Sequence, residues 1–525
     1  MRRSGSFFPL IGAALLAAPA LASIAPPRSQ IGKPQPPAAG IQAAVAAALE
    51  RAQADDCPGV LARLDPLLPG LAPGRDRDIV QLMRLPCLGP AGRPNEVAKV
   101  QAELAAAQPN NGMVRSFGIF VAINQNRFDD AGEQLVALAE QDPRALGMLP
   151  SATWRGIAQK LTEEDKFALR DRAYIALARA DWQPSDRPEM RDAVAQGAIE
   201  ALLDKKEVDE ARELLPRVTM PELLSGMAME RVYQPIWPDI EARIGPAGAK
   251  AVDRFAASRL ALLATTPDDA HALRDGVRSF ILLGRYQDAI EQAGSAPIAQ
   301  GMDEDAVAIV LYRAQALTAL GKRDEALASL AAFTTLDLNK TPQAVNGVIG
   351  LAEMLDESGR EEAALKLADT TLAGSRDALS PYGVRWLERT RACALGALGR
   401  AAEAAKQGDA LKAGSTDNEA AAVEGLLCLG RGDEAAAIAI HALGSVEGTS
   451  NIADQFQPSG AFWAAGESRL RALWVPLLAR PYVKAAFDRS ARILPQSLWP
   501  AKEPRPIPRT APAAPDGGDD VSPTT

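Results

Sequence analysis

Four cysteines and two histidines are the side chains of this 525-residue chain with the most distinctive chemistry. Cys57 and Cys87 lie 30 residues apart, and Cys393 and Cys428 lie 35 residues apart. An even number of cysteines favours disulfide bonds if the chain is exported, whereas reduced cysteines would serve as small buried apolar side chains. We therefore predict the disulfides Cys57–Cys87 and Cys393–Cys428, each worth about 3–4 kcal/mol in the chain-entropy model.

Sequence motifs for catalysis and metal binding are scarce. The histidines, His271 and His441, stand alone, and no C-x-x-C, H-E-x-x-H, G-x-S-x-G or phosphate-binding loop occurs. We predict no metal, no cofactor and no catalytic residue. One alternative is open, because Glu467-Ser468 resembles the Glu-Ser dipeptide of exported lytic transglycosylases, in which Glu467 would be the general acid. However, too few residues follow Glu467 to build a lysozyme-like domain.

The first residues are typical of a secretion signal. Arg2 and Arg3 form a basic start, residues 7–20 form an apolar segment, and small residues precede a cleavage point after Ala22. The apolar segment is too short to span a bilayer, and no later segment is apolar for long enough. We predict a cleaved signal peptide over residues 1–22 and a periplasmic or secreted mature chain without a transmembrane segment.

The overall composition indicates a helical, acidic protein. Hydrophobic residues make up 47% of the chain and aromatic residues only 5%, and alanine and leucine dominate the apolar set. Both are strong helix formers, whereas the residues that favour strands are sparse. The formal charge is −9 and there is no long basic run, so nucleic acid is not expected as a partner.

Five segments between residues 282 and 439 repeat one pattern, in which an apolar helix end is followed by Gly, polar residues, an acid and Ala. Glycine accepts the positive φ that lets the chain reverse at a helix end. The acid suits the start of the next helix, and the alanine lets the two helices cross closely. The turn glycines are Gly284, Gly321, Gly359, Gly399 and Gly430, each followed five residues later by alanine.

This pattern resembles the tetratricopeptide repeat, which runs W-x₂-L-G-x₂-Y, A-x₃-F and P over about 34 residues. The match is best over residues 265–443, and residues 41–264 hold degenerate copies, one with Asn126 in place of the turn glycine. The family's Trp is absent, and the turn glycines are 37, 38, 40 and 31 residues apart. The resemblance implies an all-α fold, a right-handed α-solenoid of antiparallel helical hairpins.

In tetratricopeptide proteins, the first helices of successive hairpins line a concave groove that binds a peptide. Arginine and aromatic side chains in such a groove can anchor a carboxylate or a peptide chain, although each position also suits an ordinary solvated helix face. Carried over to this chain, the groove residues are His271, Arg274, Arg278, Tyr312, Gln315, Glu353, Trp386 and Arg389.

The remaining segments complete the predicted organisation. Residues 23–40 hold five prolines and form a linker, and residues 501–525 hold six prolines and form a disordered tail. Residues 444–500 are rich in aromatic side chains and are predicted to be helices that cap the end of the array. Residues 216–264, rich in proline, are either a hinge or two worn hairpins.

Together these patterns favour an exported, non-enzymatic scaffold. It would bind a partner polypeptide in the cell envelope during secretion, surface-polymer synthesis or envelope assembly. Two alternatives remain: an enzyme or enzyme accessory of the lytic-transglycosylase type, with Glu467 as the acid, and a structural spacer that has no specific ligand.

Overall fold

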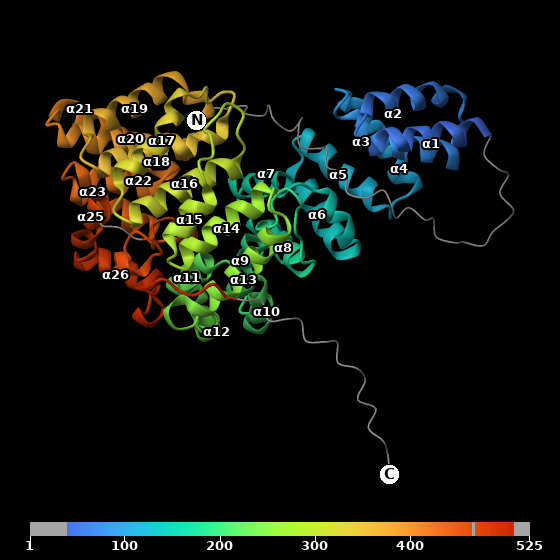
Figure 1. Ribbon diagram of the computed structural model, residues 1–525. Helices are drawn as coiled ribbons and strands as arrows, with labels where there is room; N and C mark the ends of the chain where they lie inside the picture. Colours follow the sequence, from blue (N-terminus) through green and yellow to red (C-terminus); the bar gives the residue numbers. More distant parts are fainter. Residues whose placement is uncertain (1–38, 465–467, 509–525) are drawn as a thin grey trace, which may run out of the picture. The chain divides into compact units, whose positions relative to one another are not determined.

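The computed structural model describes residues 39–464 and 468–508 (Figure 1). The predicted signal peptide with its cleavage after Ala22, residues 23–38 of the linker, Glu467 and residues 509–525 lie outside this part. Within it the chain is all-α, as predicted, and the extended backbone forms only one isolated antiparallel bridge, between Glu230 and Ala491.

The chain divides into two compact units, with the boundary between Val218 and Thr219. The sequence placed its main boundary later, between residues 264 and 265. The structure groups residues 219–264 with the C-terminal repeats because the long helix α13 (Ala249–Thr265) packs along α14 (Ala270–Leu282). Residues 219–264 form helices of irregular length, so most of this segment is hairpin-like rather than extended.

Unit 1 is an array of five hairpins. Each helix packs against the next in the chain, and α6 also packs against α8, so neighbouring hairpins stack. Its helices are α1 (Ala39–Gln53), α2 (Cys57–Leu64), α3 (Arg75–Leu88), α4 (Pro94–Ala107), α5 (Gly112–Asn124), α6 (Phe128–Gln141), α7 (Ser151–Glu163), α8 (Phe167–Arg179), α9 (Met190–Asp204) and α10 (Val208–Leu214).

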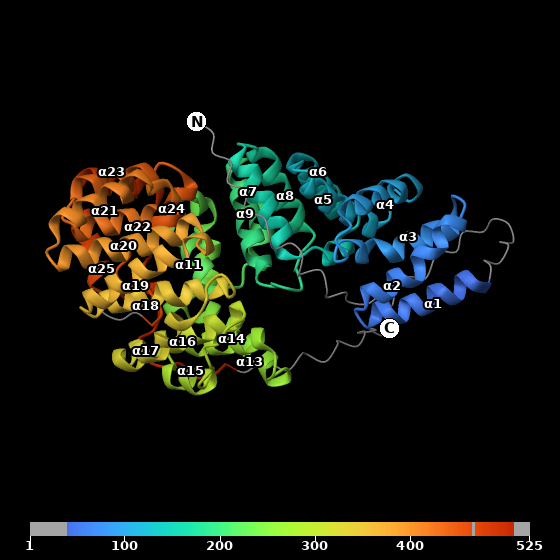
Figure 2. The ribbon, with the colours of Figure 1, turned by 90° about the horizontal axis from the view of Figure 1, so that it is seen from above.

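Unit 2 begins with α11 (Pro221–Met229), α12 (Trp237–Ile244) and α13, and continues with five regular hairpins. The first helices α14, α16, α18, α20 and α22 stack in sequence, and each pairs with its own second helix (Figures 1 and 2). The helices after α14 are α15 (Tyr286–Ala293), α16 (Glu304–Ala319), α17 (Arg323–Leu330), α18 (Val345–Glu357), α19 (Glu361–Gly374), α20 (Pro381–Ala397), α21 (Ala401–Ala413), α22 (Glu419–Cys428) and α23 (Gly432–Ala442).

The repeated turn has the predicted geometry. All five turn glycines have φ between 66° and 76°, and Asn126 takes the same conformation, with φ 56°, in unit 1. At the first turn the backbone N–H of Arg285 donates to the carbonyl of Phe280 at 2.8 Å, and the same bond recurs in the other four turns. The alanines at the crossings are buried: Ala289, Ala326, Ala364, Ala404 and Ala435.

The C-terminal segment does more than cap the array. Helices α25 (Arg469–Leu478) and α26 (Pro481–Ser490) pack on α22 and α23 and so extend the stack by one hairpin. Beyond α26, Arg492 returns to the first helices of the unit, where its backbone N–H donates to Met229 O at 2.8 Å and its guanidinium lies 3.5 Å from the centre of the Trp237 ring. The first and last elements of unit 2 are therefore in contact.

Residues 501–508 also differ from the predicted disordered tail. The backbone N–H of Arg505 donates to Leu283 O at 2.8 Å, and its guanidinium pairs with Asp253 at 2.7 Å. The neighbouring Pro504 lies against the turn glycine Gly284. The composition predicted disorder because the segment has few apolar side chains. In the structure, the backbone hydrogen bond and the ion pair of Arg505 hold residues 501–508 against α13 and the end of α14.

Candidate polypeptide-binding site

All eight predicted groove residues lie on the stacked first helices α14, α16, α18 and α20. The three arginines among them are buried rather than presented in an open groove, which corrects the prediction for those three. Gln315 and Glu353 are exposed, but the arginines are largely buried in two clusters of ion pairs, one on α14 and α16 and one on α18 and α20.

The cluster on α14 and α16 is internally paired. Arg274 contacts Asp305 at 2.7 Å and Asp275 at 2.8 Å, and His271 lies 3.7 Å from Asp305. A hydrogen bond from His271 lowers the pKa of Asp305 below its usual range, and the charge of Arg274 adds to this, whereas burial acts in the opposite direction. These side chains satisfy one another and leave little capacity for a ligand.

Arg278 is covered by helices from the start of unit 2. Its guanidinium contacts Glu222 of α11 at 2.8 Å and lies 5.3 Å from the centre of the Phe255 ring of α13. Burial alone would lower the pKa of Arg278, but the charge and hydrogen bond of Glu222, together with the charges of Tyr312 and Asp275, outweigh burial and the pKa is raised. Burial also raises the pKa of the neighbouring Tyr312. Helices α11 and α13 thus cover Arg278, one of the eight predicted groove residues.

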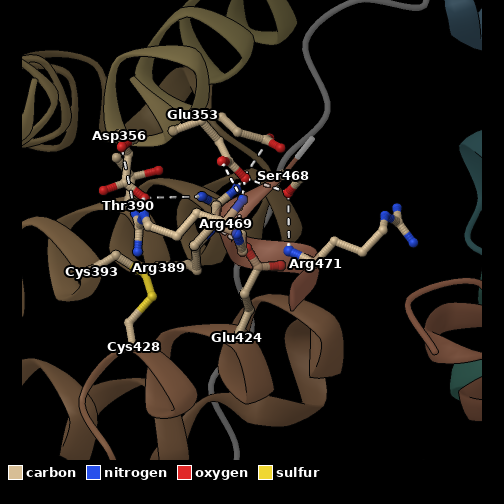
Figure 3. The surroundings of a disulfide bond; sticks show 12 residues. Glu353, Asp356, Arg389, Thr390, Cys393, Glu424, Cys428, Ser468, Arg469 and Arg471 are labelled. Atoms are coloured by element: carbon tan, nitrogen blue, oxygen red, sulfur yellow. Dashed lines mark hydrogen bonds and ion pairs between the residues drawn. A yellow bond between two sulfur atoms is a disulfide. The ribbon is translucent and has the colours of Figure 1, made fainter. Parts of the chain in front are cut away.

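The second cluster is centred on Arg389, whose side chain is only 1% exposed (Figure 3). Its guanidinium lies 3.1 Å from Glu353, 3.8 Å from Glu424 and 3.9 Å from Asp356, and it stacks on the Trp386 ring. Only the Glu353 contact is within hydrogen-bonding distance. The buried cluster is therefore held by charge more than by directed bonds.

The C-terminal segment closes over this second cluster (Figure 3). The carboxylate of Glu357, at the end of α18, accepts from the backbone N–H groups of Arg469 at 2.9 Å and Leu470 at 3.1 Å, and from the Ser468 hydroxyl. The Arg469 guanidinium lies 3.0 Å from Asp356. Glu357 thus satisfies the free N–H groups at the start of α25, where the helix dipole favours a negative charge.

Two carboxyl groups of the cluster have raised pKa values. Burial raises the pKa of Asp356 to about 6, against the charges of Arg469 and Arg389, which lower it. Burial raises the pKa of Glu424 to about 7, again against Arg389. Asp356 is fully buried and neither of its oxygens has a hydrogen-bond partner among the described residues, which explains why desolvation prevails there.

The structure contains both cysteine pairs as disulfides, Cys57–Cys87 and Cys393–Cys428, each with 5.0 Å between the Cα atoms. Cys393 lies one helical turn after Arg389 on α20, and Cys428 lies one turn after Glu424 on α22. The bond between them therefore fixes the spacing of the two helices at the ion pair, as Figure 3 shows. The first pair joins α2 to α3 in unit 1.

An open apolar groove lies on the opposite side of the repeats, between the second helices α17 and α19. It has a volume of about 680 Å³, within the range of known ligand pockets, roughly 300–1,000 Å³. Its floor comes from α18, through Val348, Leu351 and Leu355. We call it the α17–α19 groove. Its other lining residues include Leu327, Phe333, Leu336, Leu338, Ala363, Leu367, Thr370 and Thr371.

The groove exists because α17 is short. Helix α17 has 8 residues, whereas α19 has 14, and the chain after α17 turns away through the 3₁₀ helix η7 (Ala331–Thr335). The second half of α19 therefore extends beyond the end of α17 on that side. The sequence carries a signal for this groove, since the segment between Leu330 and Val345 breaks the helical periodicity.

Three charged residues lie at the rim of the α17–α19 groove. Arg360 pairs with Asp324. Lys366 is exposed and forms no ion pair within the described part of the chain. The groove therefore offers an apolar floor with one unpaired cation at its edge, which suits an apolar ligand that carries a negative charge.

Metal-binding clusters and membrane-spanning helices are both absent from the described residues. Among residues 39–464 and 468–508, no group of three or more His, Cys, Asp or Glu side chains is placed to hold a metal ion. In the same residues, no helix has the length and apolar character needed to cross a bilayer.

Comparisons with known proteins give only distant matches. No family model and no curated protein sequence matches the chain. Among solved structures, the TPR domain of P58(IPK) matches with a TM-score of 0.19 and 13% identity over 86% of this chain and 97% of that one. The Naa15/Naa10 complex bound to HypK-THB matches with a TM-score of 0.26 and 14% identity, over 86% and 60% of the two chains. The APC/C hetero-tetramer Cut9–Hcn1 matches with a TM-score of 0.25 and 10% identity, over 86% and 96%. These scores are too low to place the chain in a family, and its function is inferred from its own residues.

Proposed function

We propose that this protein is an exported, non-enzymatic scaffold of the cell envelope that binds a partner polypeptide in the α17–α19 groove. The observation that carries the proposal is the open apolar α17–α19 groove. On the first-helix side of the same repeats, the charged side chains pair with one another and are covered by the segment that begins α25. Exposed apolar surfaces of this kind in helical-repeat proteins mark places where another chain packs.

The expected partner segment is an amphipathic helix or short extended peptide. Its apolar side chains would cover Leu336, Leu355 and Leu367, which are half-buried in the free protein. An acidic side chain of the partner would pair with Lys366, the unpaired cation of the rim. The partner is thus expected to be apolar and acidic rather than basic.

Export is supported by two independent features. The first is the basic and apolar N-terminus with small residues before the cleavage point after Ala22. The second is that all four cysteines are paired, which suits an oxidising compartment better than the cytosol. The N-terminal residue of the protein purified from the periplasmic fraction tests this: Ser23 is expected, and an intact Met1 terminus would contradict export.

Photo-crosslinking in cells tests the binding site. A benzophenone amino acid at Ala363, an exposed position in the groove, should capture a polypeptide. The matched control is the same amino acid at Ala402, which is exposed on the neighbouring second helix α21. Capture at position 363 that is absent at 402 and lost on Lys366→Glu supports the proposal.

A second matched pair controls for charge. Lys366 and Lys406 each lie seven residues after a turn glycine, on α19 and α21, and both are exposed. Lys406→Glu should leave crosslinking at position 363 unchanged. Equal capture at 363 and 402, or capture that survives Lys366→Glu, would instead favour non-specific contact, and no capture at all would favour a structural spacer.

A further inference from the structure

The wall that α19 contributes to the α17–α19 groove follows a helical repeat. Ala363, Leu367, Thr370 and Gly374 all line the groove, at successive intervals of four, three and four residues. We call these four residues the α19 row. Leu367 is half-buried and the other three are exposed. Intervals of three and four residues place side chains in one line along a helix, as at the a and d positions of a coiled coil. The α19 row is therefore a surface of the kind that packs against another helix.

The side chains of the α19 row are mostly small. A Cβ atom added at Gly374 would meet no other atom within 4 Å, so this end of the row is open. Small side chains let two helices approach to about 8 Å between their axes. The floor of the groove has the same spacing, because Val348, Leu351 and Leu355 of α18 lie three and four residues apart. Wall and floor both suit the ridges of a third helix.

The groove offers little to the backbone of an extended peptide. All of its lining residues lie in helices or in the loops beside them, so it has no strand edge that could pair with a peptide. The Thr334 hydroxyl donates to Ala331 O at 2.8 Å. The Thr371 hydroxyl donates to Leu367 O at 2.8 Å. An extended backbone in this apolar groove would leave N–H and C=O groups without partners, whereas a helix satisfies these groups itself.

A proline-rich segment is also a poor match. Such segments dock between aromatic rings. The single aromatic residue among the lining residues, Phe333, is fully buried. The lining therefore favours a helix over both extended modes of binding.

One charge restricts which helices fit. Lys366 directly precedes Leu367 of the α19 row, at the place that corresponds to position g of a heptad. Charges at this position select opposite charges on the facing helix. The other two charged residues of the lining, Arg360 and Asp324, already pair with each other. Lys366 is thus the cation left for an acidic residue of the partner.

We propose that the partner segment binds the α17–α19 groove as an amphipathic α-helix laid along α19. It carries apolar residues at intervals of three and four, and one acidic residue that meets Lys366. Such a helix takes the space beside α19 that a longer α17 would fill. Ala363 and Gly374 are 11 residues apart, about 17 Å along a helix at 1.5 Å per residue. This inference rests on the proposed function and specifies the form of its partner.

The length of peptides selected on the wild-type groove tests this inference. A helix needs about 11 residues to cover the α19 row, whereas an extended peptide needs only about five or six. The shortest peptide of full affinity should therefore have at least about 11 residues. Its Kd by calorimetry should rise at least about 10-fold in both Ala363→Trp and Gly374→Trp, which block the two ends of the row. Ala413→Trp, at the exposed last residue of α21, is the matched control for Gly374→Trp, at the last residue of α19, and should bind as wild type does.

Proline substitution in the peptide provides an independent measurement. Proline in the middle of the shortest peptide should weaken binding at least about 30-fold, because it breaks a helix. Proline at the first position, which a helix tolerates, is the control and should leave Kd within about threefold of the parent peptide. Circular dichroism and the melting temperature show whether the tryptophan variants of the protein are folded.

The outcomes separate this inference from the proposed function. A six-residue peptide that loses affinity in both Ala363→Trp and Gly374→Trp would overturn the helical mode and leave the groove as the binding site. A peptide that tolerates the central proline would do the same. Peptides that bind both tryptophan variants as well as the wild type, or a library that yields no binder, would overturn the proposed function and this inference with it.

Discussion

The two sides of the C-terminal repeats are built from the same hairpins but are used differently. On the first-helix side, Arg278 and Arg389 are buried in ion pairs and covered by α11, α13 and the segment that begins α25. On the second-helix side, the short α17 leaves an apolar groove open to solvent. Buried ion pairs thus lie on the first-helix side, whereas the ion pairs of the second-helix side are exposed and an apolar groove lies open there.

This difference shows that side-chain type alone does not identify a binding surface in a repeat array. Arginines and aromatics at groove positions bind a ligand only if the rest of the chain leaves them accessible. In unit 2 the ends of the chain return to the first helices and use those side chains internally. We therefore propose that the first-helix side contributes to stability and the second-helix side to binding, and the predictions below test this division.

Arg389→Ala should give the largest effect. It leaves Glu424 buried without its main cation and removes one of the two arginines beside Asp356, and breaking a buried ion pair in this way typically costs about 3–5 kcal/mol. The matched control is Arg360→Ala on the open side, which breaks a pair with Asp324, 87% exposed, and should cost under about 1 kcal/mol. Urea unfolding followed by circular dichroism measures both. Equal losses of unfolding free energy in Arg389→Ala and Arg360→Ala would contradict the distinction between the first-helix and second-helix sides.

Removing the disulfide Cys393–Cys428 by double substitution to alanine should cost about 3–4 kcal/mol. The Cys57–Cys87 pair closes a loop of similar length, so its entropic contribution should be similar. Only the first removal should also loosen the spacing of α20 and α22 at Arg389. In a double-mutant cycle, the loss of unfolding free energy caused by Arg389→Ala should be smaller in the protein that lacks Cys393–Cys428 than in the wild type. The same substitution should cost as much without Cys57–Cys87 as in the wild type. A smaller cost only in the protein that lacks Cys57–Cys87 would refute this coupling.

The raised pKa values predict how stability depends on pH. The folded state holds protons on Asp356 and Glu424 up to about pH 6 and 7, where the unfolded chain has already released them. The free energy of unfolding should therefore fall as pH rises from about 4 to 7, and the Asp356 contribution, up to about 3 kcal/mol at 1.36 kcal/mol per pH unit, should be lost between about pH 4 and 6. Asp356→Asn should flatten this dependence. A wild-type protein that becomes more stable over the same pH range would show that the cluster is charged throughout.

The smallest effect is expected at the cap of α25. Glu357→Ala removes the acceptor of the Arg469 and Leu470 N–H groups and should cost about 1–2 kcal/mol, as other N-cap losses do. Hydrogen exchange should speed up at the first turn of α25 and not at α19. The control is Glu361→Ala, at the start of α19 on the second-helix side. Unchanged hydrogen exchange at α25 in Glu357→Ala would show that the carboxylate of Glu357 does not hold the start of α25 in place.

The local parts of this fold were predictable because each depends on residues close in sequence. Gly359 and Ala364 lie within one hairpin, and their positive φ and burial follow from the turn and the helix crossing. The pairing of Cys393 with Cys428 follows from their places on the first helices of consecutive repeats, which pack against each other. The Arg285–Asp288 ion pair after the turn, repeated in later hairpins, was not predicted, although the sequence shows it as a basic residue three before an acid.

The closed first-helix side could not be predicted in this way. Ser468 and Arg469 contact residues more than 100 positions earlier, and Arg492 contacts residues more than 250 positions earlier. Nothing in their local sequence specifies those partners. The α17–α19 groove depends on where α17 ends, and helix ends are the least certain part of a sequence-based prediction.

The most direct test of the central claim is the affinity of a selected peptide for the α17–α19 groove. Peptides enriched from a displayed random library on the wild-type protein should be apolar with an acidic residue. Their Kd by calorimetry should rise at least about 10-fold in both Lys366→Glu and Ala363→Trp, which reverse the rim charge and fill the groove. Lys406→Glu and Ala402→Trp should bind as wild type does. Selected peptides that bind all four variants equally, or that lose affinity only on Gln315→Ala or Glu353→Ala, would contradict the account and return the binding site to the first-helix side.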